Sequence, residues 1–254
     1  MFIDGLFEYL EEKCVQEDLL KDIHTLIHAD DTIVLSTNRL NFIEKCNHTK
    51  SFFDKNKLRM NKTKLWFTVI NSSSQEDKEN IRIEGGLIKH RNFLEYLGVI
   101  ISDSGSIDTD IKTYLDSRRS NVSVKYLNYC SKNRNAPLSV KLDVLDRCVT
   151  SSIIYACETW GRSSETVETI YREGLRIALD VRDCINNEIL YIESGKYPLQ
   201  CMIQKSQLRF WTNMIEYKVK NPNSALSKTI EMAKEENLRT ISYYSNLLTK
   251  YNTP

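Results

Sequence analysis

The sequence predicts an α+β fold, with short strands before Gly105 and helices after Ser106. In the first part, short apolar runs alternate with polar turns, which is typical of strands and hairpins. In the second part, apolar residues recur every three or four positions with few glycines or prolines, which indicates amphipathic helices. The 254 residues, of which 41% are hydrophobic, suffice for one large or two small units with a core.

The first part predicts a β-hairpin, covering helices and further short antiparallel strands. Asp4 is placed to cap a helix that starts near Leu6. The expected elements are a helix over 8–20, a hairpin over 22–28 and 32–37, a helix over 40–56, a strand over 65–70, a small hairpin over 81–88 with a two-glycine turn at Gly85 and Gly86, and a strand over 96–101.

The second part predicts an all-helical region. Pro137 and Pro198 stand where helices should begin, and Pro222 follows one that should have ended. Trp160 and Trp211 are expected in the core or at an interface. The expected helices cover 107–130, 138–160, 165–179 and 199–220.

Charge and hydropathy limit the class of protein. The net charge is +1, so any surface that binds nucleic acid must be local rather than global. No apolar run approaches the ~20 residues that span a bilayer, so no membrane partner is expected. The acidic N-terminal segment is unlike a secretory signal. We therefore expect an intracellular protein of the nucleus or cytoplasm that is not secreted.

Two adjacent aspartates, Asp30 and Asp31, lie between the apolar runs 26–27 and 33–35, as at the tip of a hairpin. Side chains alternate faces along a strand, whereas a tight turn can direct a carboxylate outward toward a metal ion. An ordinary solvated turn is the alternative interpretation. The pair alone does not decide between them.

Three further motifs follow the aspartate pair in order. Residues 58–64 read leucine-x-x-asparagine followed by lysine-threonine-lysine, residues 93–101 contain Tyr96-Leu97-Gly98, and residues 154–160 read tyrosine-x-x-glutamate-x-tryptophan after an isoleucine. Together with the x-Ala-Asp-Asp box at 28–31, this order resembles the reverse transcriptases of non-LTR (LINE-type) retrotransposons. The spacing between Asn61 and the lysines is shorter than in that family, and His28 replaces its usual aromatic residue.

The resemblance covers nearly the whole chain but only the second half of a reverse transcriptase domain. It implies a partial polymerase palm over 1–105, a helical thumb over 106–180 and a helical C-terminal extension over 181–254. The fingers and the earlier palm strand with a third aspartate have no counterpart, so a truncated copy is expected. Phe2-Ile3-Asp4-Gly5 looks like the missing aspartate motif, but it lies too close to Asp30 to leave room for the helix and loops that separate the two in the family.

The resemblance also implies an RNA-directed DNA polymerase site that takes an RNA template, a DNA primer and deoxynucleoside triphosphates. Asp30 and Asp31 would be the catalytic residues and hold Mg²⁺, with Asp30 as the direct ligand. Lys62 and Lys64 would lie near the triphosphate, and Tyr96, Leu97 and Gly98 would hold the primer end. Because the third carboxylate is missing, weak Mg²⁺ binding and no polymerisation by this chain alone are expected.

Two local basic clusters are candidate phosphate contacts, because lysine and arginine bind phosphates without reading sequence. Solvated surface is the alternative for both clusters. The first comprises Lys55, Lys57, Arg59, Lys62 and Lys64, and the second comprises Arg118, Arg119, Lys125, Lys132 and Arg134.

Histidines and cysteines give no strong metal pattern. His24 and His28 have a spacing that binds zinc on a helix, but the local alternation favours a strand with both on one face. The seven cysteines show no C-x-x-C spacing, so we expect reduced, mostly core thiols and no zinc site.

Two other functions remain open. The chain could be a non-enzymatic, nucleic-acid-binding remnant, or an unrelated helical interaction protein in which Asp30 and Asp31 form a simple turn. A palm that lacks neighbouring strands would also expose a sheet edge and apolar surface, which favours self-association.

Overall fold

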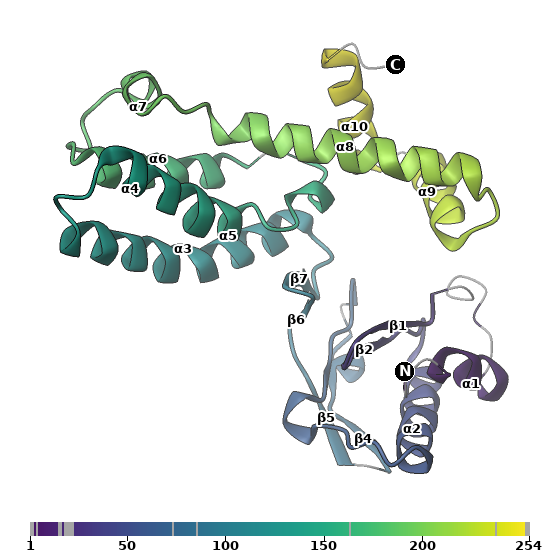
Figure 1. Ribbon diagram of the computed structural model, residues 1–254. Coiled ribbons are helices and arrows are strands. Elements are labelled where there is room, and N and C mark those ends of the chain that lie inside the picture. Colours follow the sequence, from purple (N-terminus) through teal and green to yellow (C-terminus); the bar gives the residue numbers. More distant parts are fainter. Residues whose placement is uncertain are drawn as a thin grey trace. The chain divides into compact units, whose positions relative to one another are not determined.

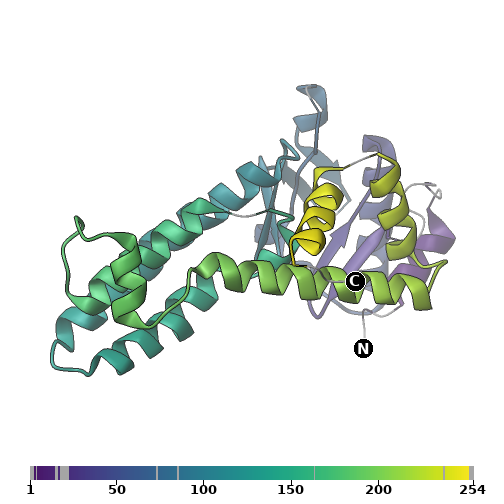
Figure 2. The same cartoon turned by 90° about the horizontal axis from the view of Figure 1, so that it is seen from above.

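The computed structural model describes the chain except for residues 1, 2, 4, 15, 16, 18–22, 73, 85, 163, 237 and 252–254, and describes 62 and 119–122 by their backbone only. The chain forms two compact units, Met1–Asp110 and Ile111–Pro254 (Figure 1). All described strands lie in the first unit, while the second is helical (Figure 2). The α+β class predicted from the sequence is therefore confirmed.

The first unit contains three small sheets among its described residues, ordered β1-β2, β3-β5-β4 and β6-β7. Strand β3 runs parallel to β5, and the other pairs are antiparallel. The elements are α1 (Leu6–Lys13), β1 (Thr25–His28), β2 (Asp31–Val34), α2 (Arg39–Lys55), η1 (Lys62–Lys64), β3 (Trp66–Phe67), η2 (Glu76–Lys78), β4 (Ile81–Ile83), β5 (Gly86–His90), β6 (Phe93–Tyr96) and β7 (Val99–Ser102).

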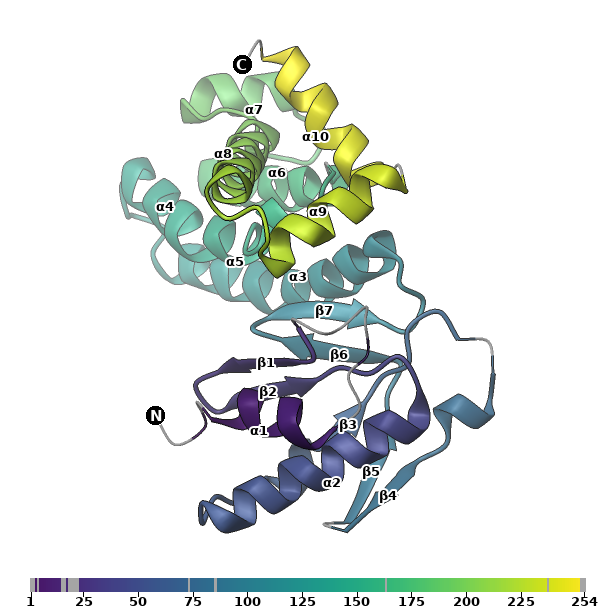
Figure 3. The same cartoon turned by 90° about the vertical axis from the view of Figure 1, so that its right-hand side faces the viewer.

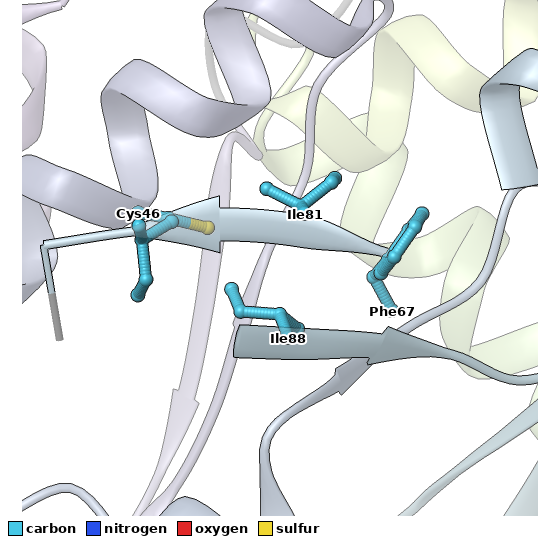
Figure 4. Close-up of a cluster of buried hydrophobic side chains, with 5 residues drawn as sticks. Cys46, Phe67, Ile81 and Ile88 are labelled. Atoms are coloured by element: carbon cyan, nitrogen blue, oxygen red, sulfur yellow. The ribbon is translucent and has the colours of Figure 1, made fainter. Parts of the chain in front are cut away.

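Helix α2 covers one face of the β3-β5-β4 sheet (Figure 3). Cys46 of α2 packs with Phe67, Ile81 and Ile88, whose side chains gather in one cluster (Figure 4). In β4, Ile81 and Ile83 are buried while Arg82 is exposed, and in β5 the buried Ile88 lies between the exposed Leu87 and Lys89, as expected for a sheet with one covered face. Burial of these apolar side chains fixes the register of the sheet, since a slip of one residue would expose all of them.

A buried ion pair connects the segment before the hairpin to α2. The carboxylate of Glu17 accepts a hydrogen bond from Lys45 Nζ, and both side chains are at most 6% exposed. Glu17 Oε1 also accepts from the backbone N–H of Thr37 at 2.9 Å and from Asn41 Nδ2 at 3.1 Å. Lys45 Nζ donates in addition to the carbonyl of Leu35 at 2.9 Å. The pair thus holds the end of the hairpin and the start of α2 together.

The second unit is a helical assembly. Helices were predicted over 107–130, 165–179 and 199–220, and these are confirmed as α3, α6 and α8, while Pro137 and Pro198 occupy the N-cap positions of α4 and α8. The elements are α3 (Ile107–Lys132), which begins within the first unit, α4 (Leu138–Val144), η3 (Leu145–Thr150, a π-helical segment), α5 (Ser151–Ile153), η4 (Cys157–Thr159), α6 (Glu165–Leu179), α7 (Asn187–Ser194), α8 (Leu199–Lys220), α9 (Ala225–Glu235) and α10 (Arg239–Lys250).

Two buried polar side chains fix helix α8. The Glu168 carboxylate accepts from the backbone N–H groups of Leu199 at 3.2 Å and Gln200 at 2.9 Å, so it caps the first turn of α8. Further along, Gln207 is fully buried and donates to the carbonyls of Cys157 at 2.9 Å and Arg162 at 2.8 Å. Burial of such groups is tolerated because their hydrogen bonds are made.

Several predicted boundaries are wrong. The helix expected over 8–20 ends at Lys13, because Cys14 has extended backbone angles, and Asp4 lies outside the described residues. The helix expected over 138–160 ends at Ile153, because Ala156 adopts a left-handed conformation with φ +58°. The strand expected over 65–70 is confined to β3. In the small hairpin, Gly86 pairs with Ile83 as part of β5 rather than lying in the turn, and Gly85 lies outside the described residues.

The burial predicted for two tryptophans is confirmed, whereas the burial predicted for most cysteines is not. Trp160 and Trp211 are buried, as predicted. All seven cysteines are free, but the prediction that most lie in the core is wrong, since the helical surface carries three of them. The buried cysteines are Cys46, Cys130 and Cys157, Cys14 is half-buried, and the exposed ones are Cys148, Cys184 and Cys201.

The buried pair yields a test of stability. The substitution Lys45→Met leaves the Glu17 carboxylate buried without its cation and should lower the free energy of unfolding by about 3–5 kcal/mol. The matched variant Lys50→Met breaks the exposed pair of Lys50 with Asp54 on the same helix and should cost under about 0.5 kcal/mol. Urea denaturation of both variants measures the difference, and equal losses would contradict the role of the buried pair.

The same pair predicts a pH dependence. Burial alone would raise the pKa of Glu17, but hydrogen bonds from Lys45 and Thr37 lower it to about 2 from an ordinary value of 4.5. The stabilisation is therefore complete above pH 4.5 and is lost as pH falls toward 2. The double variant Glu17→Gln/Lys45→Met should lack this part of the acid sensitivity in denaturation measured from pH 5 to 2.

A second test concerns the close approach of α6 to η3. A Cβ atom on Gly174 would lie 2.3 Å from Cδ1 of Leu145, a fully buried side chain. Gly174→Ala should therefore lower the free energy of unfolding by about 1–3 kcal/mol, although alanine is otherwise the better helix former. The double variant Gly174→Ala/Leu145→Val should be more stable than the sum of the single effects. Additive effects in thermal denaturation would argue against this contact.

Candidate active site

The Asp30-Asp31 pair lies at the tip of the β1-β2 hairpin. His28 pairs with Asp31 across the strands, so Ala29 and Asp30 form the two-residue connection. Ala29 has φ +53°, a left-handed conformation that alanine rarely adopts. Asp30 therefore belongs to the turn, while Asp31 is the first residue of β2, and both side chains are exposed. The sequence prediction that the pair occupies a hairpin tip is confirmed.

The two carboxylates have the donor chemistry of a magnesium ligand. Neither forms a hydrogen bond or an ion pair with another residue in the described ranges, so both are open to solvent ions. Hard oxygen donors suit Mg²⁺, which also retains several waters. Across the described part of the chain, however, no three His, Cys, Asp or Glu side chains are grouped to hold a metal. The residues fit an oxygen-ligated ion with few protein ligands.

A second hairpin tip carries Tyr96, Leu97 and Gly98. The sequence predicted one continuous strand over 96–101, and this is wrong because β6 and β7 fold back on each other, with Tyr96 paired to Val99. Leu97 and Gly98 have φ +49° and +77°. Positive φ at both central residues matches the right-handed twist of the strands, which is why glycine occurs there. Leucine at such a position is strained, and strain of this kind concentrates at functional sites.

The pKa of Tyr96 is raised by burial first and by the Asp31 carboxylate second. Strand pairing positions the backbone of both residues, since Asp31 opens β2 opposite His28 and Tyr96 closes β6 opposite Val99. The charge of Asp31 therefore acts on a side chain that is 65 residues further along the sequence (96 − 31).

The lysine motif forms a tight turn. Asn61 Oδ1 accepts hydrogen bonds from the Thr63 backbone N–H at 3.1 Å and from Thr63 Oγ1 at 2.7 Å, so this asparagine shapes η1. Lys64 is exposed, and the side chain of Lys62 lies outside the described set. Among described atoms, no hydrogen bond or ion pair connects Lys64 with Asp30 or Asp31. The structure thus explains the role of Asn61 in shaping this turn, and within the described side chains it does not join Lys64 to the aspartates.

The basic residues divide between the units. Lys57 and Arg59 are exposed after α2, and Lys55 Nζ lies 5.2 Å from the centre of the Tyr9 ring. In the second unit, the Arg118 guanidinium lies 5.5 Å from the Tyr114 ring centre. Lys125 is exposed on α3, seven residues and two turns further along the same helix face, while the side chain of Arg119 is outside the described set.

His24 and His28 do not form a shared metal site. His24 is 5% exposed, stacks on Phe7 with ring centres 4.1 Å apart, and contacts Thr25 Oγ1 through Nδ1 at 2.8 Å. His28 is exposed at the other end of β1. Burial lowers the pKa of His24, which favours the neutral ring. His24, just before β1, is therefore in a buried environment that the exposed His28 does not share.

The tyrosine-x-x-glutamate-x-tryptophan segment is structural in the second unit. Trp160 is buried and contacts Tyr114 edge to face, with ring centres 6.4 Å apart. The carbonyl of Glu158 accepts a hydrogen bond from the Tyr244 hydroxyl of α10. Sequence reasoning did not single out Glu17, Glu168 or Gln207, because a lone polar residue carries no signal of burial.

Neither models of known protein families, nor curated proteins, nor solved structures give a match when compared with this chain. In the described part of the chain, no helix combines the length and apolar character needed to cross a membrane. The geometry of the two hairpin tips is therefore the basis for a functional assignment.

The strained tip yields a prediction. Leu97→Asn should raise the free energy of unfolding by about 0.5–1 kcal/mol, because asparagine tolerates a left-handed backbone better than leucine. Leu87 is a leucine of similar exposure that lies in a strand and has no positive φ, so Leu87→Asn should give no gain. Thermal denaturation of both variants is the measurement. A loss of stability in Leu97→Asn would show that the leucine side chain matters more than its backbone strain.

Proposed function

We propose that this chain is the C-terminal part of a retrotransposon reverse transcriptase domain, with a partial palm in its first unit and a helical thumb and extension after it. The observation that carries the proposal is the pair of exposed carboxylates at one hairpin tip, together with the strained Tyr96-Leu97-Gly98 tip, where burial and the charge of Asp31 raise the pKa of Tyr96. A polymerase places its metal ligands beside the elements that hold the primer end, and the two tips provide such neighbours.

Asp30 and Asp31 would hold Mg²⁺, with Asp30 as the more direct ligand because it lies in the turn itself. The ion would supply charge stabilisation for the attacking hydroxyl and the leaving pyrophosphate. Tyr96, Leu97 and Gly98 would position the primer end, and Lys62 and Lys64 would contact the triphosphate. Two adjacent carboxylates bind the ion weakly, so polymerisation requires a third carboxylate from another polypeptide segment.

The basic side chains would contact an RNA template and a DNA primer through their phosphates. Those in the first unit are Lys55, Lys57 and Arg59, and those in the second are Arg118, Arg119 and Lys125. Each strand of the β1-β2 sheet has one neighbour among the described residues, and Leu26 on β1 is 37% exposed. Such an edge could also accept a strand from another molecule, which supports self-association.

Metal binding tests the assignment directly. Titration of the isotopically labelled chain with Mg²⁺, followed by amide NMR shifts, should show weak binding, with a dissociation constant on the order of millimolar. The shifts should centre on Asp30 and Asp31 and should disappear in Asp30→Asn, while Asp183→Asn, at another exposed aspartate, leaves them unchanged. No localised shift in the wild type would indicate an ordinary turn and an unrelated interaction protein.

Activity separates an enzyme from a binding remnant. The purified chain should show no primer extension with Mg²⁺ and deoxynucleoside triphosphates, yet it should bind an RNA–DNA primer–template with an affinity that falls as salt rises. Mg²⁺-dependent extension that Asp30→Ala abolishes would contradict the requirement for a third carboxylate. If no salt-sensitive affinity is found, nucleic-acid binding is rejected both for a polymerase fragment and for a non-enzymatic remnant.

A further inference from the structure

The outward face of the β3-β5-β4 sheet presents a basic surface around a tryptophan. Arg82 on β4 is paired with Leu87 on β5, and Lys89 on β5 is paired with Trp66 on β3. Directly paired residues, and residues two apart on one strand, point to the same side of a sheet. Their neighbours along the strands are buried against α2, namely Phe67, Ile81, Ile83 and Ile88. The side chains that point away from the core are therefore Trp66, Arg82, Leu87 and Lys89.

Arg91 extends this face beyond the end of β5. It follows Lys89 by two residues, and its guanidinium carbon lies 4.0 Å from the centre of the Trp66 ring. Arg91 is exposed and Trp66 is half-buried. A guanidinium that lies on an indole ring is a flat, charged surface with restricted rotation, and an unpaired base can stack on such a plane.

The backbone beneath this stack is fixed. The Arg91 N–H donates to the carbonyl of Phe67 at 2.9 Å, and Thr68 Oγ1 donates to the carbonyl of Arg91 at 2.9 Å. Phe67 is buried and contacts the His90 ring edge to face, with centres 5.4 Å apart. The stacked pair therefore stands on the core of the sheet rather than on a loop that must be ordered on binding.

The charge on this face has one sign. At the outward positions of the three strands, all of them described, the ionisable residues are Arg82 and Lys89, with no carboxylate. Arg91 and the exposed Lys64 add two cations at the flanks, while Glu84 lies in the turn beyond β4. Cations around a stacking plane complement a single nucleic-acid strand, in which phosphates alternate with unpaired bases.

We propose that the outward face of the β3-β5-β4 sheet, formed by Trp66, Arg82, Lys89 and Arg91, binds single-stranded nucleic acid. A base stacks on the Arg91 guanidinium that Trp66 supports, and Arg82 and Lys89 contact the flanking phosphates. Leu87 provides an apolar contact of 48% exposure next to Arg82 for a second base. This surface shares no residue with the two hairpin tips and does not depend on the proposed polymerase ancestry.

Fluorescence anisotropy with a labelled 10-nucleotide oligouridine and with a duplex of equal length tests the proposal on the full chain. The single strand should bind more tightly than the duplex. Arg91→Lys keeps the charge but removes the planar group, and should weaken single-strand binding by about 5-fold or more. Arg82→Ala/Lys89→Ala removes two phosphate contacts and should reduce the slope of log affinity against log salt by about 1.4.

Two controls distinguish this surface from charge alone and from the hairpin tips. Lys234→Ala removes one exposed cation from α9 and should change neither the affinity nor the salt slope. Asp30→Asn should leave oligouridine binding unchanged. A negative result for Mg²⁺ binding at the hairpin tip would therefore not count against nucleic-acid binding by the sheet face. Equal binding of single strand and duplex, or unchanged binding in Arg91→Lys and Arg82→Ala/Lys89→Ala, would overturn the proposal. Binding only to anionic phosphatidylserine vesicles would also overturn it.

Discussion

The buried Glu17–Lys45 ion pair is the interaction on which the candidate site of the first unit depends. The carboxylate also accepts from Thr37 and Asn41, and the ammonium donates to the Leu35 carbonyl, so the end of β2 and the first turns of α2 share one network. A buried charge is stable only when its hydrogen-bonding capacity is used. Because β2 begins at Asp31 and ends near this network, the pair constrains the hairpin that carries the two exposed aspartates.

Two of the non-glycine residues with left-handed backbone angles in the first unit lie at hairpin tips, and two others, Lys57 and Asn71, lie elsewhere. Ala29 and Leu97 both adopt left-handed backbone conformations at tips that carry predicted site residues. Neither side chain is suited to that conformation, and the surrounding strand pairs must maintain it. The positions of Asp31 and Tyr96 follow from these turns, since each residue adjoins the two-residue connection of its hairpin.

In the second unit, polar side chains define the path of a long helix that apolar packing alone would leave free to shift. Glu168 caps the first turn of α8, and Gln207 binds two carbonyls from the segment around η4 while accepting from the Tyr243 hydroxyl at 2.8 Å. Trp211 stacks on Tyr244 with ring centres 4.8 Å apart, which adds α10 to the same helix. Hydrogen bonds have stricter geometry than apolar contacts, so they specify the register of α8.

The sequence by itself determined the α+β class, the aspartate hairpin and helices α2, α3, α6 and α8, because periodicity and prolines are local signals. It did not reveal that residues 93–102 form a hairpin, since the turn depends on left-handed angles at Leu97 and Gly98 that apolar composition conceals. Only the tertiary structure placed Arg91 over Trp66 and let the charge of Asp31 act on the pKa of Tyr96. Those interactions join residues distant in sequence, and strand pairing and core packing decide them together.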